Sequence, residues 1–102
     1  MRTYPIRDEA GITFAFEALA LLFGRRFARK LETIDGVSNV RPRRRWVGLP
    51  DVHIQFSYRG RECIAWEPYG DSSRWWIGPE NTEPPHWDLS ELEKAVARFS
   101  WW

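Results

Sequence analysis

The sequence predicts one α+β domain, in which two helices pack on a mostly antiparallel sheet. Three observations carry this prediction: apolar residues at helical spacing in the N-terminal third, alternating segments in the middle, and a second amphipathic stretch near the C-terminus. A chain of 102 residues has room for one hydrophobic core. We therefore expect a single domain over residues 1–102 with the order β-α-β-β-β-α, with a meander of strands between the helices.

The first element is a short strand over residues 3–7. Pro5 lacks an amide proton for a sheet hydrogen bond, which restricts this strand to an edge or Pro5 to a position that needs no donor.

The next segment, residues 9–34, has the spacing of an amphipathic helix. Its apolar residues recur at steps of three and four and end before Asp35-Gly36, where glycine can close a helix. The stripe consists of Ile12, Phe16, Leu19, Phe23, Phe27, Leu31 and Ile34. Residues 13–23 are apolar on nearly every side, so a homodimer is possible in which a second subunit covers them.

The middle of the chain predicts a meander of strands. Residues 37–47 are expected to form a strand that enters a basic edge or loop. Residues 52–58 alternate apolar and polar side chains, Arg59-Gly60 can turn the chain, and residues 61–67 return, which together predict a hairpin. After a polar turn at residues 68–73, a short strand is expected over residues 74–77.

The C-terminal part combines an irregular loop with a final helix. Residues 78–87 contain three prolines. Asp88 followed by Glu91 has the spacing of a capping box, and the apolar stripe of the helix is then Leu89, Leu92, Val96 and Phe99.

The sequence contains no motif for catalysis, metal binding or cofactor binding. Its one cysteine, Cys63, excludes an internal disulfide and favours a cytoplasmic location. His53 and His86 have no chelating spacing, and no glycine-rich run opens a helix. The apolar stretch from Ile12 to Phe23 is too short to cross a membrane. We expect a protein that is not an enzyme, unless distant residues such as His53 and Glu67 assemble a pocket.

Charge is distributed unevenly along the chain, although the net charge is +1. Residues 25–45 carry eight basic and two acidic side chains, whereas residues 66–102 carry three basic and seven acidic ones. The basic block predicts a nucleic-acid-binding module as an alternative function, because arginines beside an exposed aromatic ring can hold phosphates and stack on bases. Its residues are Arg41, Arg43, Arg44, Arg45 and Trp46. The simpler explanation is that these arginines pair with the acidic third of the same chain.

The preferred hypothesis is a binding protein that occludes a protein partner. Trp75 and Trp76 are adjacent in a predicted strand, so they point to opposite faces and one is exposed unless both faces are covered. Tryptophan, tyrosine and arginine dominate protein interfaces, and an acidic surface can cover a basic cleft. The sequence therefore favours an inhibitor or immunity-type protein that caps a toxin or nuclease. The candidate partner-binding residues are Arg61, Tyr69, Arg74, Trp75, Trp76, Glu80 and Glu83.

Overall fold

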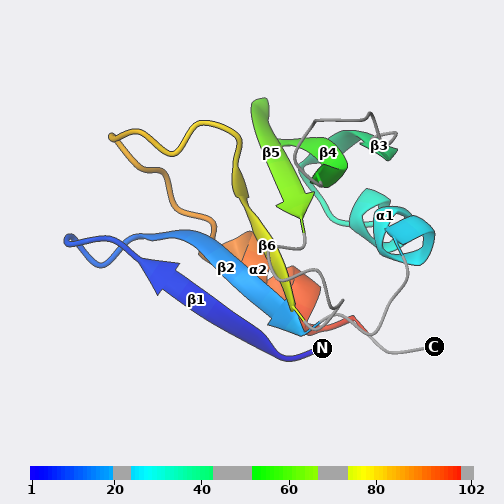
Figure 1. Ribbon diagram of the computed structural model, residues 1–102, viewed down its shortest axis with the longest axis horizontal. Coiled ribbons are helices and arrows are strands. Elements are labelled where there is room, and N and C mark those ends of the chain that lie inside the picture. Colours follow the sequence, from blue (N-terminus) through cyan, green and yellow to red (C-terminus); the bar gives the residue numbers. More distant parts are fainter. Residues whose placement is uncertain (20–23, 43–51, 67–73, 100–102) are drawn as a thin grey trace.

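The computed structural model describes residues 1–19, 24–42, 52–66 and 74–99, and these residues form one antiparallel sheet with two helices on one face. Figure 1 shows helix α2 behind strands β2 and β6 and helix α1 beside β3 and β4. The strands are β1 (Thr3–Arg7), β2 (Thr13–Leu19), β3 (Val37–Pro42), β4 (Val52–Tyr58), β5 (Arg61–Trp66) and β6 (Arg74–Pro79). The helices are α1 (Gly24–Glu32) and α2 (Ser90–Ala97). The α+β class is confirmed.

The sheet is built from a hairpin and a meander that meet in its interior. Its strand order is β1-β2-β6-β5-β4-β3. The β1–β2 hairpin occupies one edge, α1 carries the chain to the far edge, and the meander β3-β4-β5-β6 returns until β6 pairs with β2. Phe16 thereby lies opposite Ile77. Strand β1, with its exposed Pro5, is an edge strand as predicted.

The hydrophobic core lies between the sheet and the two helices. Helix α1 contributes Phe27 and Leu31, and α2 contributes Leu92 and Val96. Their sheet partners are Phe16, Ala18, Ile54, Phe56, Tyr58, Cys63, Ala65, Trp75 and Ile77. The predicted stripe of the final helix and the second half of the first predicted stripe are therefore confirmed.

The predicted helix over residues 9–34 is wrong in its first half. Residues 13–19 form strand β2, and the helix begins at Gly24. Helical spacing misled here because β2 lies between β1 and β6, and, apart from Glu17, small or apolar residues occupy both of its faces. The register shift opposite Ile6 and Arg7 also breaks the period of two. The observed order is β-β-α-β-β-β-β-α, with an additional strand before α1. The four described strands between the helices match the four segments predicted there, although the stated order counted only three.

The expected homodimer rested on an apolar helix half over residues 13–23, and residues 13–19 of it form strand β2 instead. The homodimer itself stays a prediction. The apolar side chains of β2 meet the core on one face and neighbouring strands on both edges. Residues 13–19 therefore do not form the apolar helix that a second subunit was expected to cover.

The β4–β5 hairpin was predicted with its turn. Arg59 and Gly60 both have positive φ, at 50° and 82°, which is the conformation of a type I′ turn. Gly36 is also left-handed, with φ at 88°, and lies between α1 and β3.

The predicted capping box does not form. Asp88 accepts hydrogen bonds from the amide and hydroxyl of Ser90, at 3.1 and 2.7 Å, so it closes a local turn before the helix. Glu91 pairs instead with Arg59 across the surface. The residue at the N-cap position is Leu89, which the core needs as an apolar side chain.

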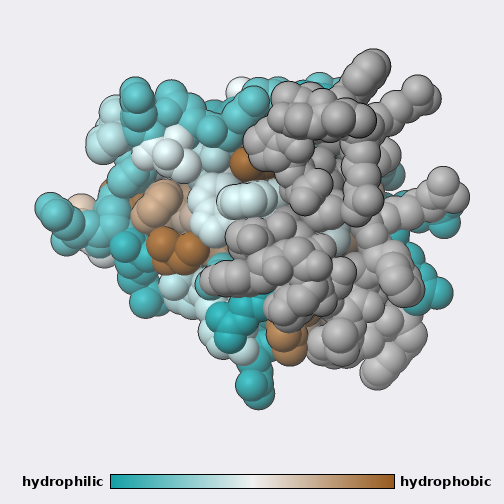
Figure 2. All heavy atoms as spheres, viewed as in Figure 1, coloured by the Kyte–Doolittle hydropathy of each residue, from teal (hydrophilic) through white to brown (hydrophobic). Residues whose placement is uncertain are grey.

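The sheet face that points away from the helices carries large side chains of its own. Register places Ile6, Ile64, Trp66 and Trp76 on this face, and all four are half-buried. Figure 2 looks onto this face and shows paler and brown residues between hydrophilic ones. Neither helix in the described part of the chain is long and apolar enough to cross a membrane.

Candidate functional site

The predicted partner-binding residues separate into two groups along strand β6. Arg61, Glu80 and Glu83 lie together at the end where β6 finishes. Arg74 and Trp76 lie toward its beginning, on the face away from the helices. Tyr69 is outside the described residues.

Two of these residues are engaged within the domain. Trp75 is 4% exposed and packs on Phe27, with ring centroids 5.1 Å apart, so it belongs to the core and drops out of the candidate surface. Arg74 lies over the Tyr4 ring at 4.3 Å and 3.7 Å from the Glu17 carboxylate.

The first group lines a surface groove of about 570 Å³. One wall is the start of β5, with Arg61 and Glu62, and the other is the segment after β6. The remaining lining residues are Pro79, Glu80, Asn81, Glu83, Pro84, Pro85 and Trp87. We call this the Glu80–Trp87 groove. Three acidic side chains and one arginine give its lining an acidic balance.

Trp87 provides the aromatic surface of the groove. The Arg61 guanidinium lies 4.7 Å from the centre of its ring, which is within the range of a cation–π interaction. Trp87 also stacks with Tyr58 at 6.2 Å, and the buried Tyr58 ties it to the core. The ring is therefore held in a fixed place and is already in contact with a guanidinium group.

The carboxylates of the groove differ in how they are engaged. Glu62 accepts hydrogen bonds from Ser57 at 2.8 Å and from Arg41 at 2.9 Å, and these bonds lower its pKa. Glu80 and Glu83 are exposed, and their carboxylates have no ion-pair partner among the described residues. These two charges are available to a partner.

Backbone hydrogen bonds fix both ends of the segment that carries the groove. The Glu80 amide donates to the Glu62 carbonyl at 3.0 Å, continuing the β5–β6 ladder. The Leu89 amide donates to the Thr13 carbonyl at 2.7 Å.

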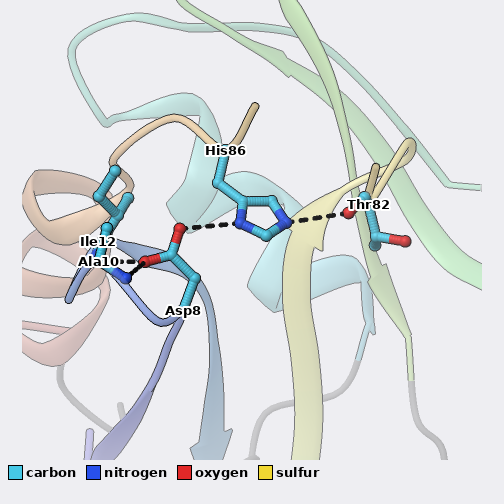
Figure 3. Close-up of polar contacts among 5 residues, drawn as sticks. All are labelled: Asp8, Ala10, Ile12, Thr82 and His86. Carbon is cyan, nitrogen blue, oxygen red and sulfur yellow. Dashed lines mark hydrogen bonds and ion pairs between the residues drawn. The ribbon is translucent and has the colours of Figure 1, made fainter. Parts of the chain in front are cut away.

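His86 fixes the middle of the same segment, as Figure 3 shows. Its Nδ1 lies 2.9 Å from the Asp8 carboxylate in the β1–β2 turn, and its Nε2 lies 3.0 Å from the Thr82 carbonyl. The ring stacks on Phe14 at 4.3 Å. Asp8 is itself held by the amides of Ala10 and Ile12, both at 2.9 Å. The contact thus joins two turns that are distant in sequence.

The Asp8–His86 contact shifts the pKa of both groups. The hydrogen bond from His86 lowers the pKa of Asp8, and the same bond raises the pKa of His86 above 6.5. Both ring nitrogens of His86 point at acceptors, so this histidine has no nitrogen free to act as a base toward a substrate.

Cys63 is not available for chemistry either. It is fully buried, and burial raises the pKa of its thiol to about 12. The reactive thiolate is therefore scarce at neutral pH. Within residues 1–19, 24–42, 52–66 and 74–99, no group of three His, Cys, Asp or Glu side chains could hold a metal ion.

The structure describes only one residue of the predicted nucleic-acid-binding segment in full. Arg41 lies in β3 and pairs with Glu62 of β5 at 2.9 Å. Glu62 lies outside the acidic third at residues 66–102, so pairing between the basic block and that third stays a prediction. Arg43, Arg44, Arg45 and Trp46 are outside the described residues.

Comparison of the chain with protein-family models, with curated proteins and with solved structures finds no match. The function must therefore be argued from the groove itself.

Sequence reasoning selected three residues of the groove and missed those that hold it in place. Trp87 lies in a proline-rich loop, and a loop has no periodic pattern from which the contacts of a side chain can be predicted. The pairing of Asp8 with His86 joins positions 78 residues apart, and only the sheet topology brings them together. No signal in the sequence indicated this pair.

Proposed function

We propose that this chain is a non-catalytic binding protein of the inhibitor or immunity type, which covers a basic surface of another protein. The observation that carries the proposal is the Glu80–Trp87 groove, where a fixed tryptophan ring lies beside two carboxylates that have no ion-pair partner in the described part of the chain. Tryptophan, tyrosine and arginine contribute most to the energy of protein interfaces, and complementary charges add specificity and speed association. A toxin or nuclease with a basic cleft is the class of partner that fits.

The internal contact between Arg61 and Trp87 supports a basic partner. It shows that the groove accepts a guanidinium group on its aromatic surface. An arginine or lysine of a partner would meet the carboxylates of Glu80 and Glu83 beside this ring. Acidic charges at the rim would also speed association with a basic surface, most strongly at low salt.

The test requires a defined complex. Immobilised protein is used to capture partners from an extract of the source cells, and a captured protein counts only after both proteins are purified and form a stoichiometric complex. We expect the purified chain to abolish the activity of that partner. We expect the double variant E80K/E83K to weaken the complex by at least about tenfold, because two favourable charge contacts become repulsive.

The matched control is Glu32→Lys, which reverses one charge on the exposed end of α1, outside the groove. It should leave the affinity within about twofold of the wild type, as expected for a charge far from the contact. A complex that tolerates E80K/E83K as well as E32K, or a partner that stays active when bound, would refute the proposal.

The nucleic-acid-binding alternative keeps its own test. It predicts that a single-stranded oligonucleotide binds at about 50 mM salt and that R43E/R44E abolishes this binding. The E80K/E83K variant should then bind the oligonucleotide at least as well as the wild type. The preferred proposal predicts no such binding.

A further inference from the structure

We infer that His86 is a proton-controlled latch: the doubly protonated ring fixes residues 80–87 against the β1–β2 turn, and loss of one proton loosens the Glu80–Trp87 groove. The regulatory part of this inference, that partner binding weakens as the proton is lost, rests on the proposed function. The latch itself does not, because it follows from the contacts of the ring.

The geometry decides the protonation state of the ring. Nδ1 faces the Asp8 carboxylate at 2.9 Å, and Nε2 faces the Thr82 carbonyl at 3.0 Å. An ionised carboxylate and a carbonyl oxygen only accept hydrogen bonds. A neutral imidazole has one N–H group and can satisfy one of them, whereas the imidazolium has two and satisfies both. The observed pair of contacts therefore belongs to the charged ring.

Removing the proton breaks the contact at one nitrogen. A neutral ring that keeps its proton on Nδ1 still donates to Asp8, but its Nε2 lone pair then faces the Thr82 oxygen. The opposite tautomer leaves a lone pair facing the Asp8 carboxylate. Either choice brings two acceptors together, and these are disfavoured at 3 Å.

The residues around the His86 ring leave Asp8 as the charged group that responds to its proton. Asp8 is the charged group that contacts the ring among the described residues, and Phe14 and Thr82 supply the other contacts. The side chains of His86 and Asp8 are 17% and 16% exposed, so the pair is largely shielded from water. His86 lies outside the lining of the groove and acts on it as a positioning residue.

The two hydrogen bonds of His86 hold the loop after β6, which forms one wall of the groove and is not part of the sheet. The bond to Thr82 closes the turn that carries Glu83, and the bond to Asp8 fixes that turn to the sheet. Between the backbone bonds at Glu80 and Leu89, it is the hydrogen bond that ties the described residues of this segment to another element, beside the ring contacts of Trp87 with Arg61 and Tyr58.

The pH at which the latch opens follows from the sign of each shift. The pKa of His86 is raised on folding, so its contribution to stability is complete below pH 6.5 and is lost as the pH rises through the higher folded value. The pKa of Asp8 is lowered, so its contribution is complete above pH 3.8 and is lost only as the pH falls through a lower value. The latch is therefore fully closed between these limits and opens toward alkaline pH.

Nuclear magnetic resonance of the ¹⁵N-labelled protein tests the latch without any partner. At about pH 6 both ring nitrogens of His86 should carry protons, and the amide signals of residues 80–87 should shift with the midpoint of its titration. Their order parameters should fall above that midpoint. Groove signals that do not change while His86 titrates would overturn the inference.

Three variants separate the latch from a purely structural role. Asp8→Asn keeps an acceptor oxygen but removes the charge, so it should move the midpoint for residues 80–87 to lower pH. His86→Phe keeps a ring on Phe14 and should abolish the transition. His53→Gln, which changes the other histidine, should leave the transition in place. The inference fails if H53Q moves the midpoint or if H86F still shows it.

The link to function is tested with the purified partner on both sides of the His86 midpoint. We expect binding to be about threefold to tenfold weaker on the alkaline side, as for the loss of one buried hydrogen bond. Loss of the His86 charge alone would strengthen binding to a basic partner, so weaker binding identifies the latch. An intact transition with unchanged affinity overturns the regulatory part, whereas a complex insensitive to E80K/E83K overturns the proposed function instead.

Discussion

Gly78 shows how one missing side chain shapes the face of the sheet opposite the helices. A β-carbon at this position would lie 2.7 Å from the Trp76 ring and 2.8 Å from the Ala15 β-carbon. Both distances are shorter than real carbon contacts allow. Gly78 has no positive φ, so the position requires glycine for space rather than for backbone conformation. The Trp76 ring can lie close against the sheet because Gly78 and Ala15 are small.

We therefore expect Gly78→Ala to lower the free energy of unfolding by about 1–3 kcal/mol, the usual cost of overpacking. Urea denaturation followed by circular dichroism measures this loss. Ala15→Gly removes one of the two clashing groups, so A15G/G78A should lose less than the sum of the two single variants. Additive losses would show that the clash is not at Ala15.

The β4–β5 turn shows what a local sequence can specify at the scale of an element. Gly60 is left-handed, and nothing lies within 4 Å of the position that a β-carbon would take. Gly60→Ala should therefore lose stability through backbone strain alone, by about 1 kcal/mol. Gly60→Asn should lose less, because asparagine tolerates this conformation better. Equal stability of wild type and G60A in urea denaturation would contradict the type I′ turn.

Sequence patterns predicted the elements that have one face buried in the core and a more exposed opposite face. The hairpin of β4 and β5 alternates because Ile54, Phe56 and Cys63 face the helices while their neighbours do not. Strand β2 gave no such contrast. Its residues meet the core on one side and neighbours as different as Ile6, Arg74 and Trp76 on the other, so Phe16 and Leu19 matched a helix by chance.

The candidate site was predictable only in part for a related reason. Arg61, Glu80 and Glu83 were selected from residue type and local charge, and the groove does bring them together. Trp75 was selected with Trp76, but alternation along a strand cannot say which of two neighbours faces the core. Asp8 and His86 depend on a pairing between distant turns, which local patterns do not encode.

At the scale of the whole molecule, the topology makes folding depend on contacts between distant parts of the chain. The β1–β2 hairpin is joined to the rest of the sheet by its pairing with β6. Loops of this length must close before the pairing contributes any stability. We expect refolding in milliseconds to seconds, as for other domains rich in distant strand pairs.

Stopped-flow tryptophan fluorescence checks this expectation, with circular dichroism as a second probe that should give the same rate. Ile77→Val, at the position opposite Phe16, changes the seam between β2 and β6 without adding volume. Its stability loss should divide between slower refolding and faster unfolding. Refolding within microseconds would contradict the importance of this seam.

The late pairing of β2 with β6 also matters while the protein is being synthesised. The β1–β2 hairpin is synthesised about 60 residues before β6, the strand that pairs with β2. At about 5–20 residues per second this is a delay of several seconds. During that interval, the hydrogen-bonding groups along one side of β2 have no neighbour, and a nascent chain can pair there with another copy. Synthesis of several copies close together is therefore the setting in which this domain is most exposed to aggregation, and chaperone binding to the β1–β2 hairpin would be most useful then.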